Sequence, residues 1–154
     1  MVKILLGQDD VDPNKPDNYG RTPLGGAAYE GHEVVVKILL GWHGIDSDKR
    51  YENGGAPLYY AALRGHEGVV KMLLERDDVN PNKQNFLGET PLCCAAYSGH
   101  EGVVKIILGR NDVDPSKPDY RGRTPLWWAS RRCHAGIRAL LQPPESTRTT
   151  PGVT

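Results

Sequence analysis

Two kinds of apolar segment alternate along the chain. Residues 33–40 read Glu-Val-Val-Val-Lys-Ile-Leu-Leu, an apolar run in which only Lys37 is expected to face outward. Residues 22–31 read Thr-Pro-Leu-Gly-Gly-Ala-Ala-Tyr-Glu-Gly. Threonine before proline favours a helix N-terminus at Thr22, and glycine favours a left-handed cap at Gly31. The pattern predicts two short helices that need neighbours to be stable.

The same pair of segments recurs every 34 residues. A fixed period of this length is typical of stacked structural repeats, in which each unit covers its neighbour. Residues 2–7 are identical to residues 36–41, so we expect the chain to begin inside a second helix of this kind rather than in a signal peptide. The landmarks that share the period are Pro23, Pro57, Pro91 and Pro125; His32, His66, His100 and His134; and Val11, Ile45, Val79 and Val113.

Within each unit the residues resemble the ankyrin repeat. The pattern Thr-Pro-Leu-x-x-Ala-Ala-x-x-Gly-His is complete in residues 22–32 and 90–100, near-complete in 56–66 and weaker in 124–134. The resemblance implies an all-α fold, an ankyrin-repeat α-solenoid of helix-turn-helix units with extended finger loops. The family's usual period is about 33 residues. The longer linkers here resemble those of ankyrin arrays in large fungal multidomain proteins.

The repeats divide the chain into one domain and a tail. We predict an ankyrin-repeat domain over residues 1–142, with a partial leading helix at 1–9. Residues 143–154 are polar, which predicts a disordered tail. Because one short helix cannot fully cover the first unit, we expect the chain to be a fragment of a longer array or a truncated product. The four units are expected at about 10–43, 44–77, 78–111 and 112–142.

Charge and cysteine content narrow the class of partner and the compartment. The formal net charge of the 154 residues is +0, which predicts no general attraction to nucleic acid or to an anionic membrane. No apolar run approaches the ~20 residues of a membrane-spanning helix. Three cysteines, two of them adjacent, form no disulfide framework and favour a reducing compartment. We expect a cytoplasmic or otherwise intracellular monomer, with the nucleus also open.

Histidines and cysteines, which bind metals or act in catalysis in other proteins, are explained here by structural roles. Histidines one unit apart would be about 10 Å from each other, too far for a zinc ion that needs donors at about 2.0–2.3 Å. Cys93 and Cys94 are interpreted as a small packing variant, and Cys133 as a strained residue in a position that prefers glycine. Phosphate-binding and nucleophile motifs are missing. We therefore expect no enzymatic activity, no cofactor and no metal site.

The positions that vary between units are the candidate functional residues, because the repeated positions hold the fold together. In the ankyrin family the partner usually binds in a concave groove made by the loop tips and the exposed end of the first helix. The corresponding residues here are rich in tyrosine and arginine, which are enriched at interface hot spots. The tip candidates are Tyr19, Arg21, Glu52, Asn53, Phe86, Leu87, Glu89, Tyr120, Arg121 and Arg123. The helix candidates are Tyr29, Glu30, Leu63, Arg64, Tyr97, Arg131 and Arg132.

We predict non-catalytic binding of a protein partner in this groove, in an adaptor or scaffold role. Arginines crowd the last unit, so the C-terminal end of the groove is expected to prefer an acidic partner segment. Two alternatives stay open, a regulator that inhibits a partner enzyme and a structural spacer from a larger multidomain protein. The alternative explanation of the same residues is sequence drift, without selection for binding a partner.

Overall fold

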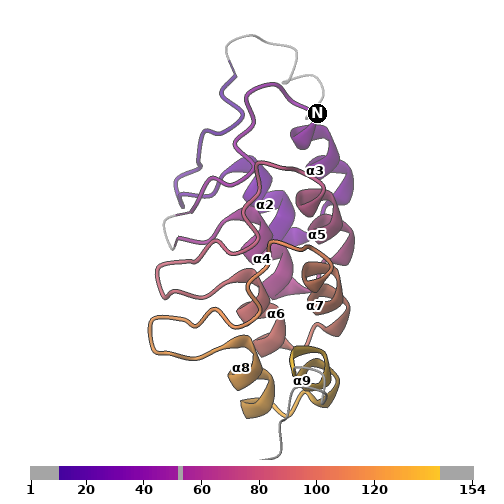
Figure 1. Cartoon of the computed structure of the whole chain (residues 1–154). Coiled ribbons are helices and arrows are strands. Elements are labelled where there is room, and N and C mark those ends of the chain that lie inside the picture. Colours follow the sequence, from indigo (N-terminus) through magenta and orange to yellow (C-terminus); the bar gives the residue numbers. More distant parts are fainter. Residues whose placement is uncertain (1–10, 52–53, 143–154) are drawn as a thin grey trace, which may run out of the picture.

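Eight short helices form two columns in the computed structural model, which describes residues 11–51 and 54–142 (Figure 1). Helices of one column pack on each other, and each also packs on its partner in the other column. The first column contains α2 (Pro23–Glu30), α4 (Pro57–Arg64), α6 (Pro91–Ser98) and α8 (Pro125–Arg131). The second contains α3 (Glu33–Leu40), α5 (Glu67–Leu74), α7 (Glu101–Leu108) and α9 (Ala135–Leu141).

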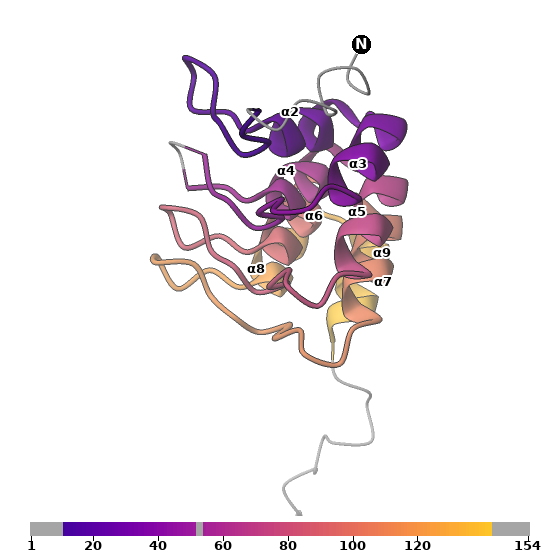
Figure 2. The same cartoon turned by 90° about the horizontal axis from the view of Figure 1, so that it is seen from above.

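The helix pairs α2–α3, α4–α5, α6–α7 and α8–α9 are numbered units 1 to 4, each with the loop before it. This order confirms the predicted all-α stack of helix-turn-helix units. The loops project from one side of the stack as fingers (Figure 2). We call their ends the tips, and the surface between the fingers and the first-column helices the groove. The expected helix at 1–9 and tail at 143–154 lie outside the described residues, as do two predicted tip residues, Glu52 and Asn53.

The first-column helices begin where the sequence predicts. The hydroxyl oxygens of Thr22, Thr90 and Thr124 each accept a hydrogen bond from the N–H three residues on, at 3.1–3.2 Å. A proline follows each threonine at the first helical position, where no N–H partner is needed. Ala56 takes the threonine position in unit 2 and provides no side-chain cap. Proline alone therefore marks the start of α4.

Small residues let the first-column helices approach closely. The alanine pairs of α4 and α6 are fully buried, and the second column adds buried valine, leucine and isoleucine to the same core. Lys37 and Lys71 lie on the other side of their helices and are exposed. One apolar core thus runs through all four units. Helices of seven or eight residues are marginal alone, so this burial is what keeps them folded.

A glycine and a histidine lock each unit to the next. Gly65 caps α4 in the left-handed conformation, with φ 79°, and the His100 ring of the following unit rests against it. A Cβ on Gly65 would lie 2.6 Å from that ring. Nε2 of His100 also lies 3.1 Å from the Leu63 carbonyl oxygen. Because a carbonyl only accepts, Nε2 carries the proton and donates. The same contact recurs with His66 and His134.

Polar contacts tie the fingers together in the same register. The Asn14 side chain both donates to and accepts from the backbone of the next finger, with both distances 2.7 Å. Asn82 repeats this pair of bonds between units 3 and 4. Between units 2 and 3 an ion pair replaces it, with Lys83 Nζ 3.0 Å from the Asp48 carboxylate. The fingers are therefore held as a row.

Cys133 departs from the glycine pattern of units 1 to 3. It occupies the position of Gly31, Gly65 and Gly99, and its φ of 61° makes it the one non-glycine residue with positive φ in the described chain. The left-handed conformation brings Cβ too close to the following carbonyl oxygen, at a cost of roughly 1–2 kcal/mol. The strain expected from the sequence at this position is confirmed.

Replacing Cys133 with glycine should stabilise the fold, because glycine adopts the left-handed conformation without strain. We expect the free energy of unfolding to rise by about 1 kcal/mol, measured by urea denaturation. The matched reverse substitution, Gly99→Ala, should lower it, since the new Cβ would lie 2.7 Å from the His134 ring. Equal or lower stability of Cys133→Gly would show that the Cys133 side chain makes contacts that offset the strain.

Candidate functional site

An aspartate or asparagine at its first position shapes each of three finger tips. The Asp119 carboxylate accepts hydrogen bonds from the N–H groups of Arg121 at 2.9 Å and Arg123 at 3.0 Å. Asp17 and Asn85 hold their tips in the same way. A side chain that bonds its own backbone two residues on is a common means of closing a turn. It leaves the intervening side chains facing solvent.

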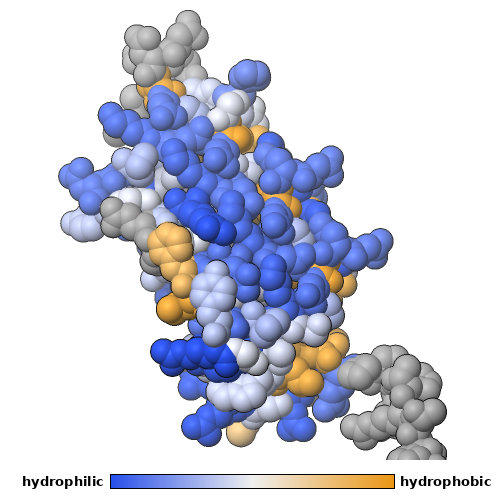
Figure 3. All heavy atoms as spheres, turned by 60° about the vertical axis from the view of Figure 1, so that its left-hand side comes forward, coloured by the Kyte–Doolittle hydropathy of each residue, from blue (hydrophilic) through white to orange (hydrophobic). Residues whose placement is uncertain are grey.

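These tips carry large apolar side chains into solvent. Tyr19 is 74% exposed, Tyr120 72%, Leu87 60% and Phe86 59%. Figure 3 turns the finger side forward and shows small apolar patches on a mostly hydrophilic surface. Exposed aromatic and aliphatic groups that gather at loop ends are typical of contact surfaces. All four residues belong to the predicted set.

Unit 2 is built differently because Tyr51 stands in the aspartate position. Its ring turns inward, is 7% exposed and stacks on Tyr60 with the centroids 4.4 Å apart. Gly25 of unit 1 makes this possible, since a Cβ there would overlap the Tyr51 ring. Burial raises the pKa of Tyr51 above its ordinary range. The sequence-based prediction did not include this coupling, although the Gly25–Gly26 pair signalled a missing side chain.

Arginine side chains lie on aromatic rings along the groove. The guanidinium carbon of Arg132 is 4.3 Å from the Tyr97 ring centroid, and that of Arg64 is 4.9 Å from the Tyr29 centroid. Both pairs join neighbouring units in the same register. Stacking on a ring is favourable for a planar guanidinium and leaves its edge donors available to a carboxylate. The groove therefore presents ordered cationic groups.

Unit 4 carries a cluster of arginines that have no acidic partner among the described residues. The ion pairs formed in this part of the chain do not include Arg121, Arg131 or Arg132, and all three are exposed. Arg123 differs, because its Nε lies 2.6 Å from the buried Asp119 carboxylate. The structure thus distinguishes one arginine that is ion-paired within the protein from three that have no acidic partner among the described residues.

The remaining predicted residues differ in their exposure to solvent and in their hydrogen-bond partners. Glu30 is exposed, whereas Leu63 is half-buried between two first-column helices. The Glu89 carboxylate accepts hydrogen bonds from the Asn85 amide at 2.9 Å and from the Tyr59 hydroxyl at 3.3 Å. Glu89 therefore faces the groove but already has partners within it. Of the predicted residues, Leu63, Glu89, Tyr97 and Arg123 lie together on one part of the groove surface.

A hollow of about 290 Å³ opens in this surface at unit 3. Its floor is formed by Cys93 and Cys94, and its walls by the rings of Tyr59, Tyr97 and Trp128. Of the residues that line the hollow, Leu63, Glu89, Tyr97 and Arg123 were among the predicted binding residues. The signal for the others was the replacement of the aromatic pairs of units 2 and 4 by two cysteines in unit 3. We call this feature the unit-3 hollow.

The two floor cysteines are buried thiols. Cys93 is 1% exposed and Cys94 4%. Burial raises the pKa of both thiols, that of Cys94 well above its ordinary value, although a hydrogen bond with Tyr59 acts in the opposite direction on Cys94. A thiol held protonated is a poor nucleophile and a poor redox sensor. This environment favours the interpretation of the pair as packing residues.

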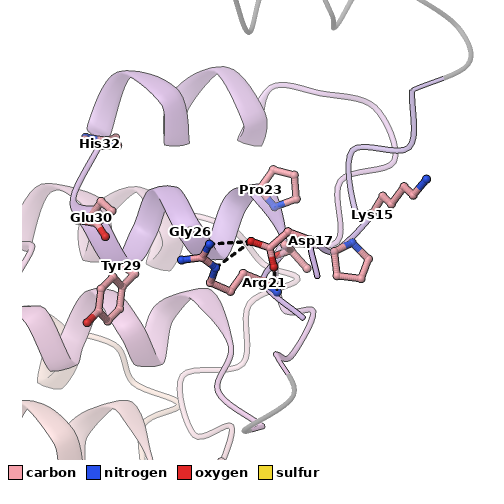
Figure 4. Close-up of a pocket in the computed structure, with 10 residues that line it drawn as sticks. Lys15, Asp17, Arg21, Pro23, Gly26, Tyr29, Glu30 and His32 are labelled. Atoms are coloured by element: carbon pink, nitrogen blue, oxygen red, sulfur yellow. Dashed lines mark hydrogen bonds and ion pairs between the residues drawn. The ribbon is translucent and has the colours of Figure 1, made fainter. Parts of the chain in front are cut away.

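A hollow lies at each end of the stack formed by residues 11–51 and 54–142. At the first end, a hollow of about 450 Å³ lies beside α2, where Arg21 Nη2 is 2.8 Å from the Asp17 carboxylate, so that their charges offset each other (Figure 4). In units 2 to 4 the equivalent side of the first-column helix is covered by the preceding unit. At the other end, Leu126, Leu140 and Leu141 line a hollow of about 640 Å³. The first hollow thus contains an ion pair that is already formed, and the second is lined mainly by leucine side chains.

The described residues contain no cluster of three or more histidine, cysteine or acidic side chains arranged to hold a metal ion. None of the eight helices is long and apolar enough to cross a membrane. What the described surface does offer is a row of exposed rings and ordered guanidinium groups. That combination suits contact with another macromolecule.

Comparison with known families agrees with this architecture. A family model described as ankyrin repeats, in three copies, matches residues 1–85 and 78–150. No curated protein matches the chain. The matched segments together cover nearly the whole sequence and every unit of the stack.

Removing the Asp119 carboxylate should change how stability depends on pH. Burial alone would raise the pKa of Asp119, but the N–H groups of Arg123 and Arg121 and the Arg123 guanidinium hold it below its ordinary 3.8. The stabilisation is therefore complete above the unfolded-state pKa and is lost as the pH falls through the lower folded value. Asparagine fits at this position, since it is the equivalent residue of unit 3, Asn85. In Asp119→Asn we expect the free energy of unfolding to be about 1 kcal/mol lower at neutral pH.

The same variant should also lose less stability than wild type when urea denaturation is repeated at falling pH below about 5. Glu75→Gln is the matched control, because Glu75 is exposed and makes no ion pair among the described residues. Parallel pH profiles of Asp119→Asn and wild type would contradict the depressed pKa.

Thiol reactivity should distinguish the three cysteines. Cys133 is exposed, whereas Cys93 and Cys94 are buried and have raised pKa values. We expect one thiol of the native protein to react rapidly with a chromogenic disulfide at mildly alkaline pH, and the other two only after unfolding. Cys133→Ser should abolish the rapid phase. A rapid phase that persists in this variant would mean that the floor of the unit-3 hollow is accessible.

Proposed function

We propose that this chain, which belongs to the ankyrin-repeat family, is a non-catalytic adaptor or scaffold that holds a protein partner in its groove. Ankyrin repeats mediate protein–protein interactions, and the family is typically non-catalytic. The finger row and the first-column helices give this chain a surface of the usual kind. Its own variable residues decide what that surface binds.

The arginine cluster of unit 4 is the observation that carries the proposal. Arg121, Arg131 and Arg132 are exposed and have no acidic partner among the described residues. Arg132 is also ordered by its stacking on Tyr97. A preorganised guanidinium loses less conformational entropy on binding and can engage a carboxylate through two donors. We propose an acidic partner segment at the C-terminal end of the groove.

The exposed tips supply the apolar part of the contact. Tyr19, Phe86, Leu87 and Tyr120 are each more than half exposed and lie on the same row of fingers. Tyrosine is enriched among the few residues that supply most of the binding free energy of protein interfaces. Charge selects and orients the partner, while these residues provide buried area.

We further propose that the chain works as a monomer inside the cell, in the cytoplasm. The support is its three free thiols, two of which are buried and form part of the groove floor. A reducing compartment preserves such thiols. The formal net charge of +0 gives no support for nucleic acid as the partner.

Charge reversal in the groove should abolish capture of the partner. Arg131→Glu/Arg132→Glu changes the net charge by four while altering two exposed side chains. The matched control, Lys71→Glu/Arg138→Glu, makes the same net change on the second-column helices α5 and α9. We expect immobilised wild type and control to retain a common protein from a cell lysate, identified by mass spectrometry, and the groove variant to retain at least about tenfold less.

Identical protein lists from all three would contradict the groove proposal and favour the spacer alternative. Loss of capture by both double variants would indicate a dependence on net charge alone. Once a partner is identified, its activity with and without the chain separates an adaptor from an inhibitor. Far-UV circular dichroism and urea denaturation show that each variant is folded.

A further inference from the structure

Unit 3 lacks the aromatic pair that fills the groove in its neighbours. In unit 2, Tyr59 and Tyr60 pack edge to face with centroids 5.2 Å apart, and in unit 4, Trp127 and Trp128 do the same at 4.8 Å. The equivalent residues of unit 3 are cysteines. Two small thiols therefore lie between the aromatic pairs of units 2 and 4.

The position of the missing ring follows from the register of the stack. The second aromatic residue of each pair contacts the first-column helix of the preceding unit, as Tyr60 does with Tyr29 at 5.9 Å and Trp128 with Tyr97 at 5.0 Å. In unit 3 this position is Cys94. No ring lies there, and the unit-3 hollow of about 290 Å³ occupies the space.

The two charged side chains at the rim of the hollow already have hydrogen-bond partners within the protein. The Glu89 carboxylate at its rim accepts hydrogen bonds from Asn85 and Tyr59. The Arg123 guanidinium, also at the rim, is bound to Asp119 and lies 4.3 Å from the Trp128 centroid. The Arg123 charge is thus paired, whereas Glu89 is bonded only to neutral groups and leaves a negative charge at the rim. An anionic group would therefore lose its hydration in the hollow without gaining a counter-charge, and the aromatic walls favour an apolar occupant.

We propose that the unit-3 hollow receives one bulky apolar side chain, leucine, methionine, phenylalanine or tryptophan, from a linear acidic segment of the partner. This deepens the proposed function and rests on it. The hollow is at the lower limit of the roughly 300–1,000 Å³ of small-molecule sites, which suits one side chain better than a whole cofactor. The walls are aromatic rings, against which apolar and aromatic groups pack favourably.

The spacing of the stack sets where the acidic residues must lie. The free arginines Arg131 and Arg132 are one unit beyond the hollow, and Arg64 lies one unit before it. Packed helices are about 8–10 Å apart, and an extended chain advances about 3.3 Å per residue. An aspartate or glutamate about three residues from the apolar residue would therefore reach one of these guanidinium groups.

Selection from a library of random linear peptides displayed on phage tests this proposal on the full chain. We expect the enriched peptides to combine a bulky apolar residue with an acidic residue about three positions away. The best peptide is then labelled and titrated by fluorescence anisotropy with wild type, Cys94→Ala and Cys94→Tyr. The tyrosine variant copies the residue of unit 2 and fills the hollow, whereas the alanine variant keeps it open.

We expect Cys94→Ala to bind within about twofold of wild type and Cys94→Tyr to bind at least about tenfold more weakly, the effect of excluding one apolar side chain. Tyr97→Ala removes a wall at a residue that is 38% exposed, and it replaces Cys94→Tyr if that variant does not fold. Changing the apolar residue of the peptide to alanine should weaken binding to wild type but have little further effect on the filled variant.

Peptides that bind Cys94→Tyr and Tyr97→Ala as tightly as wild type would overturn the inference. If their binding were still lost in Arg131→Glu/Arg132→Glu, the groove would stand as the binding surface without the apolar pocket. If neither change affected binding, the proposed function would fail as well. Enrichment of peptides without a bulky apolar residue, or of none, would overturn the linear-segment proposal alone.

Discussion

The contact between a left-handed glycine and the histidine of the following unit fixes the geometry on which the rest of the structure depends. The glycine ends the first-column helix and leaves no Cβ where the imidazole must lie. The imidazole in turn donates to a carbonyl near the end of that same helix, which would otherwise lack an intrahelical partner. One contact thus ends a helix, satisfies its backbone and sets the position of the next unit.

Because this contact recurs from unit to unit, equivalent positions of the units form rows on the surface. Residues that are 34 apart come to lie side by side, and the core positions within a row stay nearly constant. The groove rows vary instead, from glycine through tyrosine and cysteine to tryptophan. A change at a groove position of one unit therefore creates a local feature, because the apolar core is built from other positions of both helix columns. The unit-3 hollow and the arginine cluster of unit 4 are two such features.

The fold could be predicted almost entirely from local signals, but the groove only in part. Threonine followed by proline marked the helix starts, and the strain at Cys133 followed from its place in the glycine series. The sequence did not reveal that Glu89 and Arg123 are bound within the protein, since their partners depend on how fingers and helices meet. The inward turn of Tyr51 over Gly25 was also missed, because it couples two different units. Such pairs are not visible when the sequence of each unit is considered alone. They become visible when equivalent positions of neighbouring units are compared.

The side chain of Cys133 also changes the surface that unit 4 presents at the end of its first helix. In units 1 to 3 a Cβ at the capping glycine would lie 2.5–2.7 Å from the histidine ring of the next unit. Unit 4 has a Cβ at that place. The glycine–histidine contact that joins units 1 to 4 therefore cannot form at Cys133 in the same geometry, because the Cβ takes the space of the imidazole.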